Sequence, residues 1–110
     1  MRIPNADQAV IAQEKLRDYL LNPEHRRGGP KARVLLGMGF GSDHWAELEA
    51  ELRLRHLTAD FESETDNQYG RRYEILAPLV GLNGRVVRFR SIWQVDTGNI
   101  IPRLITMYPE

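Results

Sequence analysis

Apolar positions near the start of the chain recur with the spacing of an α-helix. Leu16, Tyr19 and Leu20 fall at i, i+3 and i+4 within residues 3–22, and this spacing predicts an amphipathic helix with one face toward a core. A short extended piece at residues 9–11 is expected before the helix. Pro23 ends the helix, because the residue before a proline is pushed out of the α-helical region. The sequence therefore opens with a helix whose apolar side is a single stripe.

Two further helices are expected before the chain changes character. Residues 28–40 predict a short one, because Pro30 lies in its first turn, where its fixed φ suits a helix and its missing N–H costs nothing. Residues 42–57 predict the third, with Ser42 as its N-terminal cap. The apolar positions expected to face the core are Ala32, Leu35, Leu36, Trp45, Leu48, Leu52 and Leu54.

From residue 58 onward the period of the apolar positions changes to two, which predicts β-strands. The expected strands, separated by polar turns, are residues 58–64, 71–81, 85–95 and 100–108. The Asn83–Gly84 pair is the strongest short signal of a tight hairpin. Pro78 favours an edge or a bulge in the second strand.

The order of these elements, with helices first and strands after, predicts an α+β fold. Two or three N-terminal helices are expected to pack on one face of a four-stranded antiparallel β-meander, and the opposite face is left open to solvent or a ligand. No repeat, low-complexity segment or internal linker interrupts the sequence. A length of 110 residues fits one domain, so residues 1–110 are expected to form a single unit.

Alternation along the third predicted strand assigns its side chains to the two faces of the sheet. One face, which we call the arginine face, is expected to gather Arg88, Arg90, Gln94 and Arg103. The other is expected to gather Phe89, Ser91, Trp93, Leu104 and Thr106. The places of Arg103 and Thr106 assume that the turn pairs Val95 with Ile100, and a slip of one residue would break the assignment.

Each face allows two interpretations. The arginine face can hold a polyanion, since Arg binds phosphate in a bidentate manner, but the outward face of a half-buried sheet is also commonly polar. On the other face, Ser91 and Thr106 either flank a pocket beside Trp93 or hydrogen-bond across the strands.

The distribution of charge along the chain suggests nucleic-acid binding as one interpretation. The net charge is zero, yet residues 1–42 carry +3, residues 43–70 carry −6 and residues 71–110 carry +3. Arg accounts for thirteen of the fifteen cationic residues. This preference suits phosphate contacts, but a GC-rich genome produces it equally.

Composition also excludes several kinds of protein. With no Cys, the chain has no disulfide framework, thiol nucleophile or thiolate metal site. No apolar run approaches the ~18 residues that a membrane span needs, so no membrane contact is expected. The opening MRIPNADQ lacks the apolar core of a signal peptide. We expect a cytoplasmic protein, although a toxin module cut from a longer secreted chain would have the same composition.

The placement of histidine does not indicate a metal site. His25, His44 and His56 have no partner four residues further on, and no H-E-x-x-H motif is present. His44 and His56 are expected at the surface, near the two ends of the third helix. We therefore predict neither a metal ion nor another cofactor.

The stretch NPEHRRGGPK, residues 22–31, gathers the side chains that phosphate chemistry requires. Arg26, Arg27 and Lys31 surround a helix start whose free N–H groups favour an anion, and His25 is placed beside it to act as a base near neutral pH. RNA cleavage needs a base for the 2′-hydroxyl proton, cations for the charged phosphorane and an acid for the leaving oxygen. The alternative is a solvated connection in which His25 only caps the first helix.

Short motifs extend over nearly the whole chain: YLLNPEH, G..KA, GLNGR, SIW.V and PRLIT.Y. In these motifs the chain resembles a small bacterial family of uncharacterised domains. Related domains look like the C-terminal payloads of polymorphic and phage-associated toxins. The order of helices and strands is similar to that of the barnase–EndoU–colicin–RelE group of RNA-cleaving toxins, and stand-alone members look like partners in toxin–antitoxin pairs. The chain departs from the family pattern at Arg26, where members often have Pro.

The sequence supports three alternative hypotheses about the function. The first is a metal-independent ribonuclease of toxin type that acts on RNA. Its expected catalytic residues are His25 as base, Lys31 and Arg90 as phosphate ligands, and Thr106; its RNA-binding residues are Arg26, Arg27, Arg88 and Arg103; and its pocket residues are Ser91 and Trp93. The second is a non-catalytic module that binds a small antitoxin-like protein through the sheet. A third is an RNA-binding domain without chemistry.

Overall fold

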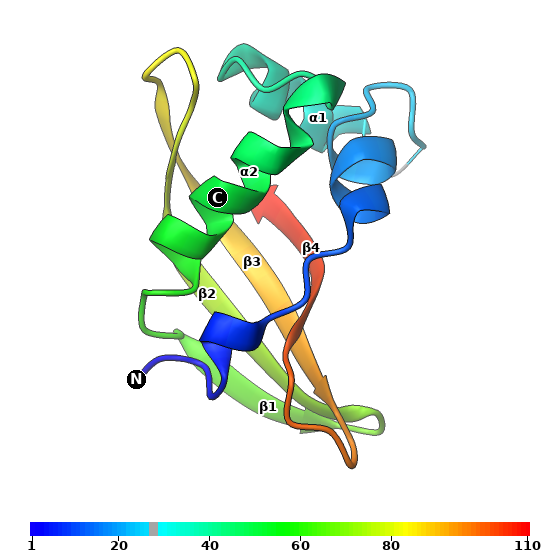
Figure 1. Cartoon of the computed structure of the whole chain (residues 1–110), viewed down its shortest axis with the longest axis vertical. Helices are drawn as coiled ribbons and strands as arrows, with labels where there is room; N and C mark the ends of the chain where they lie inside the picture. The colour runs from blue at the N-terminus through cyan, green and yellow to red at the C-terminus, as the bar shows by residue number, and fades with distance from the viewer. Residues whose placement is uncertain (27–28) are drawn as a thin grey trace.

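The computed structural model of the chain describes residues 1–26 and 29–110. Helices come first and a four-stranded antiparallel sheet follows, as the colours along the chain show in Figure 1. The strands are β1 (Ser63–Asn67), β2 (Gly70–Val80), β3 (Val86–Asp96) and β4 (Arg103–Pro109), and they lie side by side in that order. The predicted α+β fold with a β-meander is confirmed.

The helical half is built from short segments. They are η1 (Ala6–Gln8), η2 (Lys15–Leu20), α1 (Gly29–Gly37), η3 (Ser42–His44), α2 (Trp45–Glu51) and η4 (Leu52–His56). Of these, η1 and η3 are 3₁₀ turns, whereas η2 and η4 are π-helical. The second expected helix is confirmed as α1, and the third as the continuous run of η3, α2 and η4.

The first expected helix occupies only the later part of residues 3–22, and the extended piece predicted at residues 9–11 is confirmed, because Val10 joins the sheet. The Val10 N–H donates to the carbonyl of Pro102 (2.9 Å), and the Val10 carbonyl accepts from the N–H of Leu104 (3.0 Å). Figure 1 shows this blue segment running beside β4. Backbone groups that bond to the sheet are unavailable to a helix, so the helix begins only after them.

The apolar stripe of the third helix is confirmed in part. Leu48 and Leu52 are fully buried, but Leu54 is 60% exposed. The inward position one turn after Leu52 is taken by His56, which is fully buried, as side chains four residues apart share a helix face. The surface position expected for His56 is therefore wrong, and so is the core position expected for Leu36, which is 41% exposed.

The first strand lies further along the chain than the predicted 58–64, because polar residues that resembled a turn extend it. Its side chains are mostly exposed at the edge of the sheet. Arg71 holds them across the hairpin through ion pairs with Glu64 (3.3 Å) and Asp66 (2.9 Å). Cross-strand charge pairs of this kind support an edge strand that has no apolar residue of its own.

Pro78 lies in β2 at a position where β2 is locally an edge. The pairing of β1 with β2 ends at Ser63 and Glu74, so no strand runs beside Pro78 on that side. A residue without an N–H is tolerated there, and the predicted edge position is confirmed.

A bulge in β4 changes the face on which its second half lies. Leu104 pairs with Trp93, but Thr106 pairs with Ile92, which leaves Ile105 unpaired between them. A bulge adds one residue to one strand and so reverses the alternation beyond it. Thr106 therefore lies on the arginine face, and its predicted place on the face of Trp93 is wrong.

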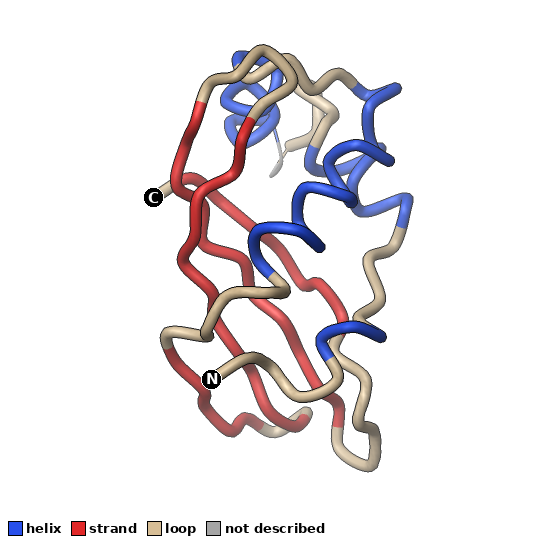
Figure 2. The backbone as a smooth tube through the Cα atoms, turned by 60° about the vertical axis from the view of Figure 1, so that its left-hand side comes forward, coloured by secondary structure: helices blue, strands red, loops and turns tan. Residues whose placement is uncertain are grey.

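The helices gather on one side of the sheet, as Figure 2 shows. On that side the buried side chains of the sheet are Tyr73, Ile75, Ala77, Leu79, Phe89, Ser91, Trp93, Leu104 and Met107. The arginine face points the other way. The segments η2 and α1 meet the sheet at the edge formed by β4, and this junction brings together several polar side chains.

Candidate functional site

Both lysines of the chain meet at one phenol. Lys31 donates hydrogen bonds to the hydroxyl oxygens of Tyr19 (3.2 Å) and Thr106 (2.9 Å). The ammonium groups of Lys15 and Lys31 lie 5.7 and 5.2 Å from the centre of the Tyr19 ring, within the range of a cation–π contact. The His25 ring packs edge-on against the same ring, with 4.5 Å between the two centres. We call these five residues the lysine–tyrosine cluster.

The bulge in β4 joins the sheet to this cluster. The carbonyl of the extra residue, Ile105, accepts a hydrogen bond of 2.8 Å from the ammonium group of Lys15. The bulge also turns Thr106 away from the core face, so that its hydroxyl reaches Lys31. The wrong face predicted for Thr106 and the formation of the cluster thus have the same physical cause.

On the helical side, η2 supplies two members of the cluster. Its π-helical turn is closed by the N–H of Leu21, which donates to the carbonyl of Leu16 at 2.8 Å. Lys15 and Tyr19 are four residues apart and share one side of η2, whereas Leu16 and Leu20 are fully buried. Single π-helical turns occur frequently at functional sites.

The loop between η2 and α1 holds His25 beside the cluster. The Gly29 N–H donates to the carbonyl of His25 at 2.8 Å. A Cβ atom added at Gly29 would lie 2.6 Å from the carbonyl oxygen of Pro23, which is too close for any side chain. Glycine is therefore required where the loop doubles back, and this tight path places the half-buried His25 ring against Tyr19.

The two lysines carry charge that no carboxylate neutralises within the described residues. Lys15 and Lys31 form no ion pair there, and their partners are hydroxyl and carbonyl oxygens. The arginines that do form ion pairs are Arg17, Arg53, Arg55, Arg71, Arg90 and Arg103. Two uncompensated ammonium groups side by side create a local positive potential that attracts an anion.

The same charges act on the phenol. Burial by itself would raise the pKa of Tyr19, but the net pKa lies below its ordinary value. The hydrogen bond and charge of Lys31 lower it, and a hydrogen bond with Thr106 and the charge of Lys15 lower it further. A phenol whose pKa is closer to neutrality transfers a proton more readily.

Of the predicted catalytic residues, the structure brings His25, Lys31 and Thr106 together. Sequence reasoning missed Tyr19 and Lys15. Tyr19 fits the apolar stripe of the first helix and was therefore assigned to the core. One signal was available: in a chain whose other cationic residues are all Arg, the two lysines stand at positions 15 and 31, in the two helical segments that flank the loop of His25.

Arg90, the fourth predicted catalytic residue, lies on the face of Thr106 but is engaged elsewhere. It faces Tyr108, two pairs along from Thr106 in the β3–β4 ladder. Its guanidinium forms ion pairs with Glu62 (3.4 Å), Glu74 (3.2 Å) and Glu110 (3.4 Å). The hydrogen bond that Arg90 donates to Glu110 is the largest cause that raises the pKa of Arg90. A phosphate would have to displace a carboxylate to reach this side chain.

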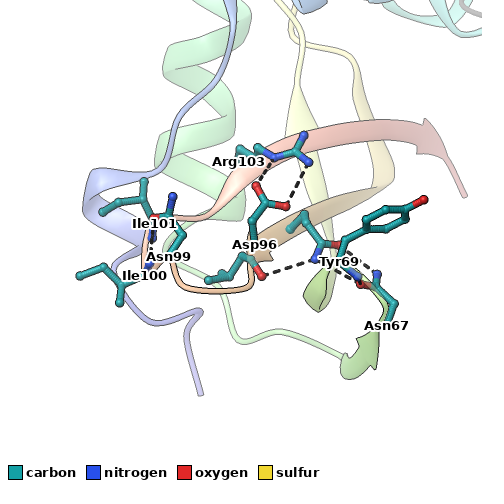
Figure 3. Close-up of polar contacts among 9 residues, drawn as sticks. Asn67, Tyr69, Asp96, Asn99, Ile100, Ile101 and Arg103 are labelled. Carbon is teal, nitrogen blue, oxygen red and sulfur yellow. Dashed lines mark hydrogen bonds and ion pairs between the residues drawn. The ribbon is translucent and has the colours of Figure 1, made fainter.

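The predicted RNA-binding arginines are spread over the surface. Arg103 forms a two-pronged ion pair with Asp96, at 2.8 and 3.2 Å (Figure 3), which commits it to the hairpin end of the sheet. Arg88 and Arg26 are exposed. Arg27 lies outside the described residues.

The two predicted pocket residues are in the core. Ser91 and Trp93 are fully buried, and the Trp93 Nε1–H donates to the Ser91 hydroxyl oxygen at 2.8 Å. The same hydroxyl lies 2.7 Å from Nδ1 of His56, whose Nε2 lies 3.1 Å from the carbonyl of Ala77. Burial lowers the pKa of His56 to about 4. These side chains therefore form a hydrogen-bonded network in the core. None of the hydrogen bonds described for residues 1–26 and 29–110 joins this network to the lysine–tyrosine cluster.

Within residues 1–26 and 29–110, no group of three or more His, Cys, Asp or Glu side chains is placed to hold a metal ion. In the same part of the chain, no helix combines the length and the apolar character needed to cross a membrane. The lysine–tyrosine cluster itself offers two ammonium groups, a phenol, an imidazole and a hydroxyl, which together suit binding of an anion and transfer of protons.

Comparison with known proteins places the chain in a family and relates its fold to one solved complex. Residues 2–110 match the family model described as "Domain of unknown function (DUF6883)". No curated protein matches the chain. A chain of the contact-dependent growth inhibition toxin–immunity protein complex from Klebsiella pneumoniae 342 is similar in structure, with 19% sequence identity, coverage of 93% of this chain and 100% of that chain, and a TM-score of 0.73. At this identity the likeness is one of fold.

Proposed function

The chain belongs to the DUF6883 family of domains of unknown function, and we propose that it is a toxin-type domain that cleaves RNA without a metal ion. The observation that carries the proposal is the lysine–tyrosine cluster, which gathers the groups that phosphodiester cleavage needs. The fold shared with a chain of a toxin–immunity protein complex supports it. Fold alone does not determine a function, so the argument rests on the cluster.

In the proposed reaction, His25 removes the proton from a ribose 2′-hydroxyl, and the 2′-oxygen attacks the adjacent phosphorus. The phosphorane that forms gains negative charge, which the ammonium groups of Lys31 and Lys15 stabilise. Thr106, whose hydroxyl oxygen accepts from Lys31 at 2.9 Å, fixes the direction of that ammonium group. The products are a 2′,3′-cyclic phosphate and a 5′-hydroxyl.

The arginines are assigned to phosphates on either side of the reacting one. Arg90 shares the sheet face of Thr106 but is held by carboxylates, so it binds a neighbouring phosphate by exchange. Arg88 continues the path along the arginine face, and Arg26 extends it from the loop. Contacts of this kind position the backbone and make affinity depend on salt.

The test is cleavage of RNA by the purified protein in the presence of a metal chelator. The wild-type protein should release products that end in a 2′,3′-cyclic phosphate. Lys31→Met and His25→Ala should each lower the rate by about 100-fold or more. Arg33→Met is the matched control, since it removes an exposed charge from the same helix α1 and should leave the rate unchanged. Full activity of His25→Ala would show that His25 is not the base.

We also propose that a small antitoxin-like protein binds the chain and masks the cluster. The complex with the similar fold contains an immunity protein, which is what motivates this part of the proposal. Expression of the chain alone should arrest growth, and co-expression of a neutralising neighbour should restore it and yield a stable complex. Restored growth without any complex would contradict direct binding.

The competing proposal is a non-catalytic protein-binding module, and one observation favours it. The carboxylates around Arg90 leave the arginine face with less free positive charge than RNA binding would use. A module of this kind would bind a neighbouring protein, would leave RNA intact, and would be insensitive to Lys31→Met and His25→Ala.

A further inference from the structure

The proposed cleavage needs an acid for the leaving 5′-oxygen, and we propose that Tyr19 is that acid. The inference rests on the proposed ribonuclease function and adds the residue that completes its proton transfers. Tyr19 lies at the centre of the lysine–tyrosine cluster, where its hydroxyl contacts Lys31 at 3.2 Å and its ring packs on His25 at 4.5 Å between ring centres. A proton donor and a proton acceptor therefore lie side by side.

The hydrogen bonds at the phenol leave its proton available. Lys31 is the donor in its bond to the phenolic oxygen of Tyr19, because an ammonium group has donors but no acceptor. The phenol thus uses a lone pair in this contact and keeps its own O–H. The hydrogen bond with Thr106 lowers the pKa of the phenol, as a bond accepted by the phenolic oxygen does, so it leaves the same proton available. An O–H whose oxygen already accepts from a cation is a stronger donor toward a second partner.

The surroundings also favour the phenolate that proton donation leaves behind. The groups that face Tyr19 are Lys15 from η2, Lys31 from α1, Thr106 from β4 and His25 from the loop. The two lysines hold the pKa of the phenol below its ordinary value in spite of burial. An acid is most effective when its pKa approaches the working pH, so these charges improve the phenol as a donor.

Other members of the cluster suit the role less well. The ammonium group of Lys31 is needed in its charged form beside the phosphorane. Giving up its proton would remove that charge while the phosphorane carries its greatest negative charge. The alcohol of Thr106 is a much weaker acid than a phenol. His25 acts as the base in the same step and cannot also be the acid.

The step balances in atoms, protons and charge. The bond between the 2′-oxygen and phosphorus forms while the bond between phosphorus and the 5′-oxygen breaks. The 2′-hydroxyl proton ends on His25, and the proton of Tyr19 ends on the 5′-oxygen. A proton then returns from the imidazolium to the phenolate through water, and both residues are ready for the next cleavage.

The experiment compares two RNA substrates that differ only at the leaving atom: the natural linkage, and an analogue in which sulfur replaces the bridging 5′-oxygen. A thiolate leaves without a proton, so it needs no acid. Tyr19→Phe should lower cleavage of the natural linkage by about 100-fold or more and that of the sulfur linkage by less than about tenfold. Lys31→Met should impair both, because it removes charge stabilisation. Tyr69→Phe, at a tyrosine that is 63% exposed, is the matched control and should impair neither.

The outcomes separate this inference from the function on which it rests. If the wild-type protein cleaves neither linkage, the proposed ribonuclease function is wrong and the inference falls with it. If the wild-type protein cleaves both, then equal loss on both linkages in Tyr19→Phe, or no loss at all, overturns the inference alone. If Lys31→Met lost activity on the natural linkage but cleaved the sulfur linkage as fast as the wild-type protein, the acid would be Lys31 instead.

A spectroscopic titration gives a readout that does not depend on activity. Absorbance of tyrosinate as a function of pH should show one phenol of the wild-type protein ionising ahead of the others. Tyr19→Phe should remove this first ionisation, and Lys15→Met should move it to higher pH, because a positive charge beside the phenol is lost. A titration curve that Tyr19→Phe leaves unchanged in shape and starting point would overturn the inference.

Discussion

Acidification should destabilise this protein through one buried imidazole. His56 is fully buried, between the Ser91 hydroxyl and the carbonyl of Ala77. Because the carbonyl of Ala77 can only accept, the proton of the neutral histidine belongs on Nε2, and Nδ1 accepts the proton of the Ser91 hydroxyl, whose oxygen accepts from Trp93 Nε1–H. Every polar atom of this group is satisfied while the imidazole is neutral.

Protonation would break the arrangement. A proton on Nδ1 of His56 would face a serine oxygen that already accepts from Trp93, and the serine would lose the acceptor for its own proton. The positive charge would also be buried among apolar side chains. Burial accordingly lowers the pKa of His56 from 6.5 to about 4. The unfolded chain binds this proton near the ordinary value of ~6.5.

The sign and size of the effect follow from linkage. Between the two pKa values the unfolded state binds more protons than the folded state, so the free energy of unfolding falls as the pH falls. The contribution is fully present above the unfolded pKa and is lost as the pH drops toward the folded pKa. A difference of about 2.5 units, at ~1.4 kcal/mol per unit, amounts to roughly 3 kcal/mol. This is a large fraction of the ~5–15 kcal/mol that stabilises a small domain.

The assay is urea unfolding, followed by tryptophan fluorescence and circular dichroism, at several values from about pH 7 to about pH 4. The matched control is His56→Gln, whose side-chain amide can donate to Ala77 and accept from Ser91 but does not titrate. The other ionisable groups are common to both proteins, so the difference between the two unfolding free energies reports His56. Wild type should lose about 3 kcal/mol relative to the variant across this range. Parallel curves for the two proteins would refute the reasoning.

Three further predictions concern stability and the shape of the site. Gly29→Ala should destabilise the fold by about 1–3 kcal/mol and impair RNA cleavage, because its methyl group would meet the Pro23 carbonyl; thermal unfolding and a cleavage assay check this, and an unchanged protein would contradict the tight path of the loop. Ser91→Ala should cost about 1–3 kcal/mol in urea unfolding, since it leaves two buried nitrogen atoms without their partner, and a neutral effect would argue against the buried network. Arg90→Met should lower the melting temperature more than Arg103→Met, because it leaves three carboxylates facing one another rather than one; the reverse order would show that the cluster around Arg90 is not stabilising.

The fold class was predictable because it depends on periodicity. The change from a helical period to a period of two at residue 58 is local information, and it separates the helices from the sheet without any knowledge of contacts. The extended piece at residues 9–11 was also predicted, but its partner was not. The backbone of Val10 bonds to Pro102 and Leu104, some ninety residues away, and no local pattern identifies such a partner.

The candidate site was predictable in its residue types and less so in its geometry. His25 and Lys31 were found because a histidine and cations gather in one loop, and the structure places both beside Tyr19. Thr106 was included for its hydroxyl but assigned to the wrong face. Tyr19 was missed because a tyrosine has two characters. Its apolar ring matches the apolar stripe of a helix, so it was assigned to the core, while its polar hydroxyl can still take part in a site.

The lysine–tyrosine cluster depends on three departures from regular structure, one from each segment that builds it. The π-helical turn of η2 carries Lys15 and Tyr19, the close approach at Gly29 fixes the loop of His25, and the bulge at Ile105 turns Thr106 toward Lys31. Periodicity describes regular elements only, so it cannot reveal any of the three. Irregular turns and bulges cost stability, and natural proteins keep them where they aim a side chain at a site. Their coincidence around one phenol is therefore itself an argument for placing the proposed chemistry at this junction and not on the arginine face.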